Sequence, residues 1–87
     1  MSIIVQLTYD MGKTLGEDRI AVEGVETVRD IVARVKERFG DEEASFERLT
    51  RVAAVSVNGV LVNHRRGMKT RVSDGDTVAF VKAAAGG

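Results

Sequence analysis

The group in this chain best placed for covalent chemistry is the C-terminal carboxylate, where Gly86 and Gly87 follow three alanines. A carboxylate reacts with nucleophiles only after one oxygen has been converted into a better leaving group. Neither glycine has a Cβ, so the backbone can pass through a narrow channel and adopt φ values that other residues avoid. Five residues from Ala83 reach at most about 17 Å, at roughly 3.3–3.6 Å per extended residue. A tail made of Ala85, Gly86 and Gly87 is therefore slim and long enough to enter a partner protein, with Gly87 as its reactive end.

A Gly-Gly end can also be a frayed terminus without a function. Other features of the sequence are therefore needed to choose between a functional and an inert tail. One further candidate is a basic cluster that could dock an acidic partner surface, although a solvated loop explains it slightly better. Its members are His64, Arg65, Arg66, Lys69 and Arg71. Asp74 and Asp76 could be paired carboxylates for acid–base work, but Asp-Gly-Asp before a strand is typical of a turn. A lone histidine without cysteine is a poor metal site.

Apolar residues near the tail form a second candidate docking surface for a partner protein. Its members are Val60, Val62, Val78 and Phe80, although for Phe80 a place in the core is the favoured interpretation. Four lysines could accept an isopeptide bond if the protein forms chains, but solvated surface residues are the simpler interpretation. They are Lys13, Lys36, Lys69 and Lys82.

Composition limits the classes of protein to consider. The 87 residues suffice for one small domain with a modest core and little material for a deep pocket. Thirteen basic residues balance thirteen acidic ones, whereas nucleic-acid binders usually carry a basic excess. Cysteine is absent, which excludes disulfides and thiolate chemistry. No window approaches the roughly 20 apolar residues of a membrane span, and no signal peptide is visible. We expect a cytoplasmic protein that binds neither nucleic acid nor membrane.

Hydrophobic periodicity predicts the elements that position the tail. We expect strands at residues 3–9, 18–22, 52–57, 60–62 and 76–82. Residues 10–16 read as a loop, 41–50 as a loop or short helical turn, and 64–71 as an irregular connection. A helix should begin after Thr27 as N-cap and end before Gly40, at a positive φ. Its apolar stripe consists of Val28, Ile31, Val32, Val35 and Phe39. Asn58-Gly59 predicts a two-residue hairpin turn.

This order of elements indicates an α+β protein in which one main helix packs on one face of a mixed four- to five-stranded sheet. It matches the β-grasp, or ubiquitin-like, roll. We expect a single β-grasp domain over residues 1–82 and a flexible Gly-Gly tail over residues 83–87.

Three segments resemble the MoaD/ThiS group of ubiquitin-like sulfur carriers. They are Val55–Gly59 (VSVNG), Asp74–Phe80 (DGDTVAF) and the terminal Gly86-Gly87. The resemblance extends over nearly the whole chain and includes the archaeal small modifier-like proteins. Residues 81–85 depart from it, because molybdopterin-type carriers usually have proline before Gly-Gly, so the pathway stays open.

The resemblance implies a carrier rather than an enzyme, with no cofactor of its own. A ubiquitin-activating-type enzyme, similar to MoeB or ThiF, would use ATP and Mg²⁺ to adenylate the Gly87 carboxylate. Sulfur transfer would give a thiocarboxylate, which would donate sulfur to a partner enzyme of molybdopterin, thiamin, cysteine or related biosynthesis. Alternatively, the activated Gly87 would form isopeptide bonds with target proteins, as a ubiquitin-like modifier does. A third hypothesis is a non-covalent interaction module with an inert tail.

Overall fold

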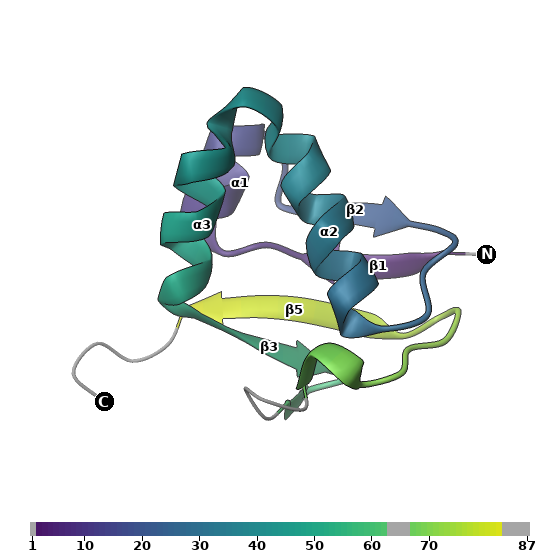
Figure 1. Cartoon of the computed structure of the whole chain (residues 1–87). Coiled ribbons are helices and arrows are strands. Elements are labelled where there is room, and N and C mark those ends of the chain that lie inside the picture. Colours follow the sequence, from purple (N-terminus) through teal and green to yellow (C-terminus); the bar gives the residue numbers. More distant parts are fainter. Residues whose placement is uncertain (1, 63–66, 83–87) are drawn as a thin grey trace.

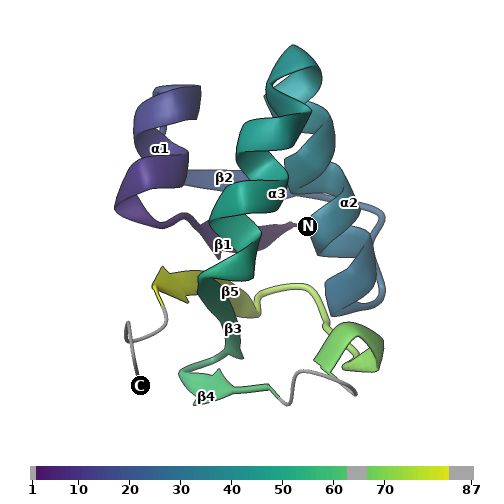
Figure 2. The ribbon, with the colours of Figure 1, turned by 60° about the vertical axis from the view of Figure 1, so that its left-hand side comes forward.

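The computed structural model describes residues 2–62 and 67–82, and these form a mixed sheet with helices on one side (Figures 1 and 2). Five strands occur in the described part of the chain: β1 Ile3–Gln6, β2 Arg19–Val22, β3 Ala53–Val57, β4 Val60–Leu61 and β5 Thr77–Lys82. Their order in the sheet is β2-β1-β5-β3-β4. The central pair, β1 and β5, is parallel, and the other pairs are antiparallel. This is the β-grasp arrangement, as the sequence predicted.

The longest helix, α2, spans Val28–Phe39 and begins with a complete capping box. The Thr27 hydroxyl accepts from Asp30 N at 3.3 Å, and an Asp30 carboxylate oxygen accepts from Thr27 N at 3.2 Å. At the other end Gly40 has φ 53°, so the predicted glycine stop is confirmed. Four members of the predicted apolar stripe are buried and Val32 is half-buried. The helix therefore forms where capping and periodicity agree.

Residues 10–16 were predicted to be a loop, and this was wrong. They belong to helix α1, Tyr9–Leu15, and the preceding strand ends at Gln6 rather than at residue 9. The Thr8 hydroxyl caps the helix by accepting from Met11 N at 3.1 Å, and Gly16 ends it at φ 77°. Met11 is fully buried, so the short helix is held by one large core side chain. Gly12 and Gly16 lie within residues 10–16, and two glycines in so short a segment indicate a turn rather than a helix.

Residues 41–50 form more regular structure than the loop or short turn that we expected. A 3-10 turn, η1 Gly40–Glu42, leads into the nine-residue helix α3, Glu43–Arg51. Phe46 anchors α3, because its ring is buried and its centroid lies 5.1 Å from that of Phe39. Lys36 adds an exposed ion pair with Glu43 at 2.8 Å. A second 3-10 turn, η2 Gly67–Lys69, lies in the described part of the expected irregular connection.

Candidate functional site

Strand β5 is the last described element before the predicted tail. Val78 pairs with Val5 of β1, and Phe80 pairs with Val55 of β3. Val78 and Phe80 are both buried, so the strand is tied on both sides and anchored in the core. Lys82 still pairs with Ala53, which makes it the last residue that the sheet holds in the described chain. The predicted tail residues Ala85, Gly86 and Gly87 lie outside the described residues.

The turn before β5 is held by a side-chain network. The Asp76 carboxylate accepts from Ser73 N at 2.8 Å and from the Asn58 side-chain amide at 3.1 Å. The hydrogen bond from the Ser73 backbone, followed by that from Asn58, lowers the pKa of Asp76 below its ordinary value. Asp76 therefore stays ionised and stabilises the turn. This agrees with the turn interpretation of Asp74 and Asp76 and leaves no geometric support for an acid–base pair.

The predicted docking residues do not form one surface. Phe80 is only 4% exposed, so its side chain is not available for docking; the favoured core interpretation is confirmed. Its pairing with Val55, which packs on the core, turns it toward the helices. Val62 is half-buried, and Val60 and Lys69 are exposed. Arg65 and Arg66 lie outside the described residues, as does His64.

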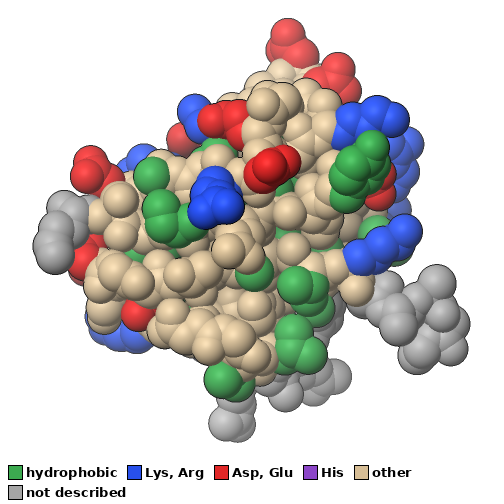
Figure 3. Space-filling model, turned by 180° about the vertical axis from the view of Figure 1, so that it is seen from behind, with side chains coloured by type: hydrophobic (Ala, Val, Ile, Leu, Met, Phe, Trp, Pro, Cys, Tyr) green, Lys and Arg blue, Asp and Glu red, His purple; other side chains and the backbone are tan. Residues whose placement is uncertain are grey.

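The opposite side of the sheet carries a different apolar set, which we call the outer face. Side chains alternate along a strand, so residues next to the buried Val78 and Phe80 point away from the helices. The apolar residues of the outer face are Ile4, Ala54, Ala79, Leu61 and Val81, and the uncharged polar residues Gln6, Ser56 and Thr77 lie on the same side. Leu61 is 65% exposed and Val81 38% exposed. Figure 3 shows a side of the molecule whose lower part has few charged side chains. The alternation in residues 77–82 could have revealed this set.

A groove lies beside Lys82, the last described residue of β5. It has a volume of about 250 Å³ and is lined by Thr8, Tyr9, Asp10, Leu49, Val52, Ala53 and Lys82. Tyr9, at the N-terminus of α1, is 80% exposed. Sequence reasoning missed this feature because it predicted neither α1 nor the full length of α3, whose ends form the groove walls.

No group of three His, Asp or Glu side chains in residues 2–62 and 67–82 is arranged to hold a metal ion. Within the same residues, no helix has the length and apolar character needed to cross a membrane.

A sequence profile of the ThiS family matches residues 6–87, almost the entire chain. The chain belongs to the ThiS family. The match agrees with the resemblance found in the sequence, and it places this ThiS-family chain among ubiquitin-like sulfur carriers and modifiers. Members of this group are small carrier proteins rather than catalysts. A search of curated proteins gave no match.

Solved structures agree with this assignment. CysO in the BexX/CysO complex of Amycolatopsis orientalis is 29% identical to this ThiS-family chain, with a TM-score of 0.75, covering 98% of this chain and 99% of the other. Small archaeal modifier protein 1 from Haloferax volcanii has 19% identity, a TM-score of 0.75 and full coverage of both chains. A complex of molybdopterin-converting factor subunits 1 and 2 from Helicobacter pylori gives 17% identity and a TM-score of 0.64, again with full coverage. Two of these similar proteins were solved together with a partner.

Proposed function

We propose that this protein is a sulfur carrier whose Gly87 carboxylate is adenylated by a partner enzyme and then converted to a thiocarboxylate. The observation that carries the proposal is the ThiS-family match through residue 87, on a body whose last strand leads directly toward the Gly-Gly end. In this proposal the folded body binds the partner, and residues 83–87 extend from it into the partner's active site.

The chemistry balances without a catalytic group on this chain. A carboxylate oxygen of Gly87 attacks the α-phosphorus of ATP, and pyrophosphate leaves with magnesium in the partner enzyme. A hydrosulfide ion or the outer sulfur of a partner's persulfide then attacks the acyl carbon, and AMP leaves. Hydrosulfide gives the thiocarboxylate directly after loss of its proton. A persulfide gives an acyl disulfide, and a second thiol of the partner then attacks the partner's own sulfur, so that a partner disulfide forms and the thiocarboxylate leaves. A partner enzyme of molybdopterin, thiamin, cysteine or related biosynthesis can consume the thiocarboxylate.

The outer face is the surface that we propose docks the adenylating enzyme. Val81 lies on it and directly precedes the end of β5, so an enzyme that receives the tail also meets this face. The partner surface should be apolar, because the outer face carries leucine, valine, isoleucine and alanine and little charge. The match to CysO in the BexX/CysO complex is consistent with docking of the body.

Two substitutions on neighbouring residues test this docking surface. Leu61 pairs with Ser56 on the outer face, whereas Val60 pairs with Val57, which packs on the core side. Leu61→Glu should raise the KM of the adenylating enzyme for the carrier about tenfold or more. Val60→Glu, a matched change at an equally exposed position, should have a much smaller effect. A larger effect of Val60→Glu would favour the set predicted from sequence, which contains Val60 and not Leu61. No effect of Leu61→Glu would contradict docking at the outer face.

Intact mass spectrometry of the protein purified from its native host tests the function. A species heavier by the difference between one sulfur and one oxygen atom, mapped to Gly87 by fragmentation, is the expected result. Mapping separates it from oxidised methionine, which gives a similar shift. Gly86→Leu should abolish loading by blocking entry of the tail. Only unmodified carboxylate, after incubation with ATP and host extract, would overturn the proposal in favour of an interaction module, for which removal of Gly86 and Gly87 leaves binding intact.

A ubiquitin-like modifier is the second candidate, because the fold matches small archaeal modifier protein 1 over its full length. In that case the mass spectra would show Gly87 joined to a lysine amine of a target or of a second copy. Lys36 is held by Glu43 at 2.8 Å, whereas Lys13, Lys69 and Lys82 are exposed and better placed to accept.

A further inference from the structure

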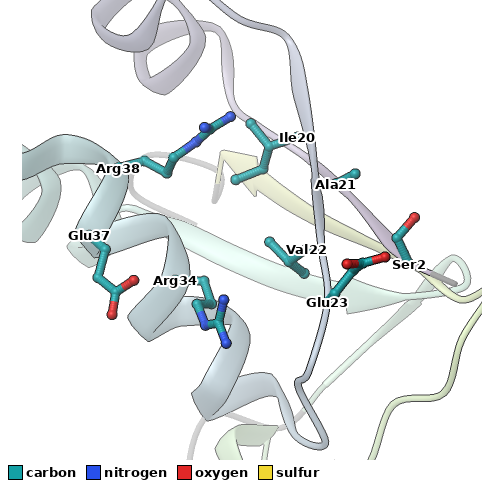
Figure 4. A pocket seen from close by; sticks show the side chains of 8 residues that line it. All are labelled: Ser2, Ile20, Ala21, Val22, Glu23, Arg34, Glu37 and Arg38. Atoms are coloured by element: carbon teal, nitrogen blue, oxygen red, sulfur yellow. The ribbon is translucent and has the colours of Figure 1, made fainter.

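The two edge strands of the sheet differ in how they are held. At one edge, β2 stands beside α2, and Figure 4 shows its Ile20 and Val22 on the α2 side, where both side chains are buried. At the other edge, β4 consists of only Val60 and Leu61, which are both exposed, and it pairs with β3 alone among the described strands. Segments with few buried apolar contacts open locally at the lowest free energy. The β3–β4 hairpin should therefore open more readily than the β2 edge.

The turn of this hairpin carries a reactive pair of residues. Asn58 and Gly59 join β3 to β4, and both are exposed. In an Asn-Gly sequence the backbone nitrogen of glycine can attack the side-chain carbon of asparagine, because glycine has no side chain to obstruct the approach. A Cβ at Gly59 would meet nothing within 4 Å, so neighbouring residues do not crowd the turn either. The other asparagine of the sequence, Asn63, is followed by the bulkier His64.

The reaction needs only water and mild base. Base removes the proton from Gly59 N, and the nitrogen then forms a bond to Cγ of Asn58. The bond from Cγ to the side-chain nitrogen breaks, and ammonia leaves after taking up a proton. Water then opens the cyclic imide at one of its two carbonyl carbons. One opening gives aspartate, and the other gives isoaspartate, in which the backbone runs through the former side chain.

Asn58 is held at three points by residues at the start of β5. Its backbone N–H donates to Thr77 O at 2.8 Å, and its side-chain oxygen accepts from Thr77 N at 2.9 Å. Its side-chain nitrogen donates to an Asp76 carboxylate oxygen at 3.1 Å. Ring closure draws Cγ toward Gly59 N and releases the side-chain nitrogen, so both side-chain hydrogen bonds must break first. The nitrogen that has to leave is the one that Asp76 holds.

We propose that Asn58 is a site of spontaneous deamidation, which Asp76 and Thr77 protect while the hairpin is closed and which local opening of the hairpin exposes to reaction. In the closed hairpin both polar atoms of the amide are bound at the start of β5. Once the turn leaves β5, the amide rotates freely and water replaces both partners. The rate of modification is therefore set by how often the hairpin opens. The inference concerns this chain alone, and it holds whether or not Gly87 carries sulfur.

Either product would weaken the connection between the hairpin and β5. Aspartate at position 58 would place a second carboxylate where the amide now donates to Asp76, so a hydrogen bond would be replaced by repulsion between like charges. Isoaspartate would also lengthen the backbone of the two-residue turn and disturb the register that places Val57 opposite Val60.

Peptide mapping of the full chain after incubation in mildly alkaline buffer tests the proposal. Trypsin cleavage after Arg51 and Arg65 gives one fragment, residues 52–65, that contains both asparagines. Fragment ions locate the mass gain that accompanies conversion of an amide to a carboxyl group. In guanidinium chloride, Asn58 should react much faster than Asn63, because glycine follows it. In the folded wild type, Asn58 should react more slowly than in guanidinium by about tenfold or more.

Substitutions then identify the protecting contact. Asp76→Ala removes the acceptor that holds the leaving nitrogen and should speed deamidation of the folded chain about fivefold or more. Asp76→Asn keeps an acceptor without the charge and should give a smaller increase. Asp74→Ala, at an exposed position in the same turn, is the matched control and should leave the rate unchanged. Circular dichroism checks that each variant is folded, and the guanidinium comparison does not depend on any variant.

Thr27→Ala separates local opening from global unfolding. It removes the capping hydroxyl of α2, which lies outside the hairpin, so it should leave the rate at Asn58 unchanged. Equal acceleration by Thr27→Ala and Asp76→Ala would overturn the proposal, because the reaction would then proceed through the unfolded chain. It would also be overturned by an Asp76→Ala protein that reacts no faster than the wild type, or by equal rates at Asn58 in the folded and unfolded wild type.

Discussion

The side-chain amide of Asn58 donates to the carboxylate of Asp76 at 3.1 Å, joining two turns that are 18 residues apart in sequence. Asn58 lies in the β3–β4 turn, and Asp76 directly precedes β5. The carbonyl oxygen of the same Asn58 amide accepts from Thr77 N at 2.9 Å. One side chain therefore links the hairpin to the start of the strand that carries the tail. Asn58 also has φ 51°, a left-handed conformation that asparagine tolerates better than most residues.

Replacing Asn58 separates its two contributions. Asn58→Ala should lower the free energy of unfolding by about 1–2 kcal/mol, because it removes two hydrogen bonds and strains a positive φ. Asn58→Gly loses the same hydrogen bonds but accepts that φ, so its loss should be smaller. Urea unfolding monitored by circular dichroism measures both. Equal losses for the two variants would show that the backbone conformation contributes nothing.

Acid should weaken the fold partly through Asp76 and Asp30. Backbone hydrogen bonds, from Ser73 to Asp76 and from Glu26 to Asp30, lower both pKa values below 3.8. A carboxyl whose pKa is lower in the folded state contributes stability above 3.8, and this is lost as the pH falls through the folded pKa. In Asp76→Asn the urea midpoint should therefore differ most from that of the wild type at neutral pH, and the difference should shrink below pH 3.8. A difference independent of pH would contradict this cause.

The capping box of α2 should contribute measurably to stability. Thr27→Ala removes the hydroxyl that accepts from Asp30 N, and it should cost about 1 kcal/mol. Thr27→Ser keeps the acceptor and serves as the control, with a much smaller change. Thermal and urea unfolding of the three proteins would test this, and a Ser variant as unstable as the Ala variant would rule out the hydrogen bond as the cause.

Gly12 should be intolerant of even a methyl group, although alanine favours helices. A Cβ at Gly12 would lie 2.7 Å from the Glu17 carbonyl oxygen, which belongs to the backbone and cannot turn aside. Gly12→Ala should therefore destabilise the protein by about 1–3 kcal/mol despite its better helix propensity. Lys13→Ala, the adjacent exposed position, should change stability little. A more stable Gly12→Ala protein would mean that α1 can shift away from residue 17 without cost.

Elements with a strong local signal were predictable from the sequence. Helix α2 has its cap, stripe and glycine stop within the chain from Thr27 to Gly40, and Asn58-Gly59 specifies a hairpin turn by its own φ preference. Helix α1 also has a capping threonine and a glycine stop, but it spans only seven residues, contains Gly12, and has Met11 as its one buried apolar side chain, so its apolar periodicity is too short to read. Its formation depends on tertiary contacts that local periodicity does not contain.

The strand that precedes the predicted tail was predictable, whereas the surface around its end was only partly so. Phe80 and Leu61 are both large and apolar, and only strand pairing decides that Phe80 faces the helices and Leu61 the outer face. The register of β3 against β4 and β5 settles this choice, and it depends on residues far apart in sequence. The groove lined by Tyr9 also depends on contacts between residues far apart in sequence, because residues at the ends of α1 and α3 and Lys82 together form its walls.

The parallel pairing of β1 and β5 also determines how the protein would respond to mechanical force. Ile4, Val5 and Gln6 run alongside Thr77, Val78 and Ala79 in the same direction. A pull on the tail against a hold on the N-terminus would slide these strands past each other, loading their hydrogen bonds together and not one after another. If a partner pulled on the Gly-Gly end, the hydrogen bonds between β1 and β5 would resist unfolding most strongly. The folded body should therefore stay intact under such a force.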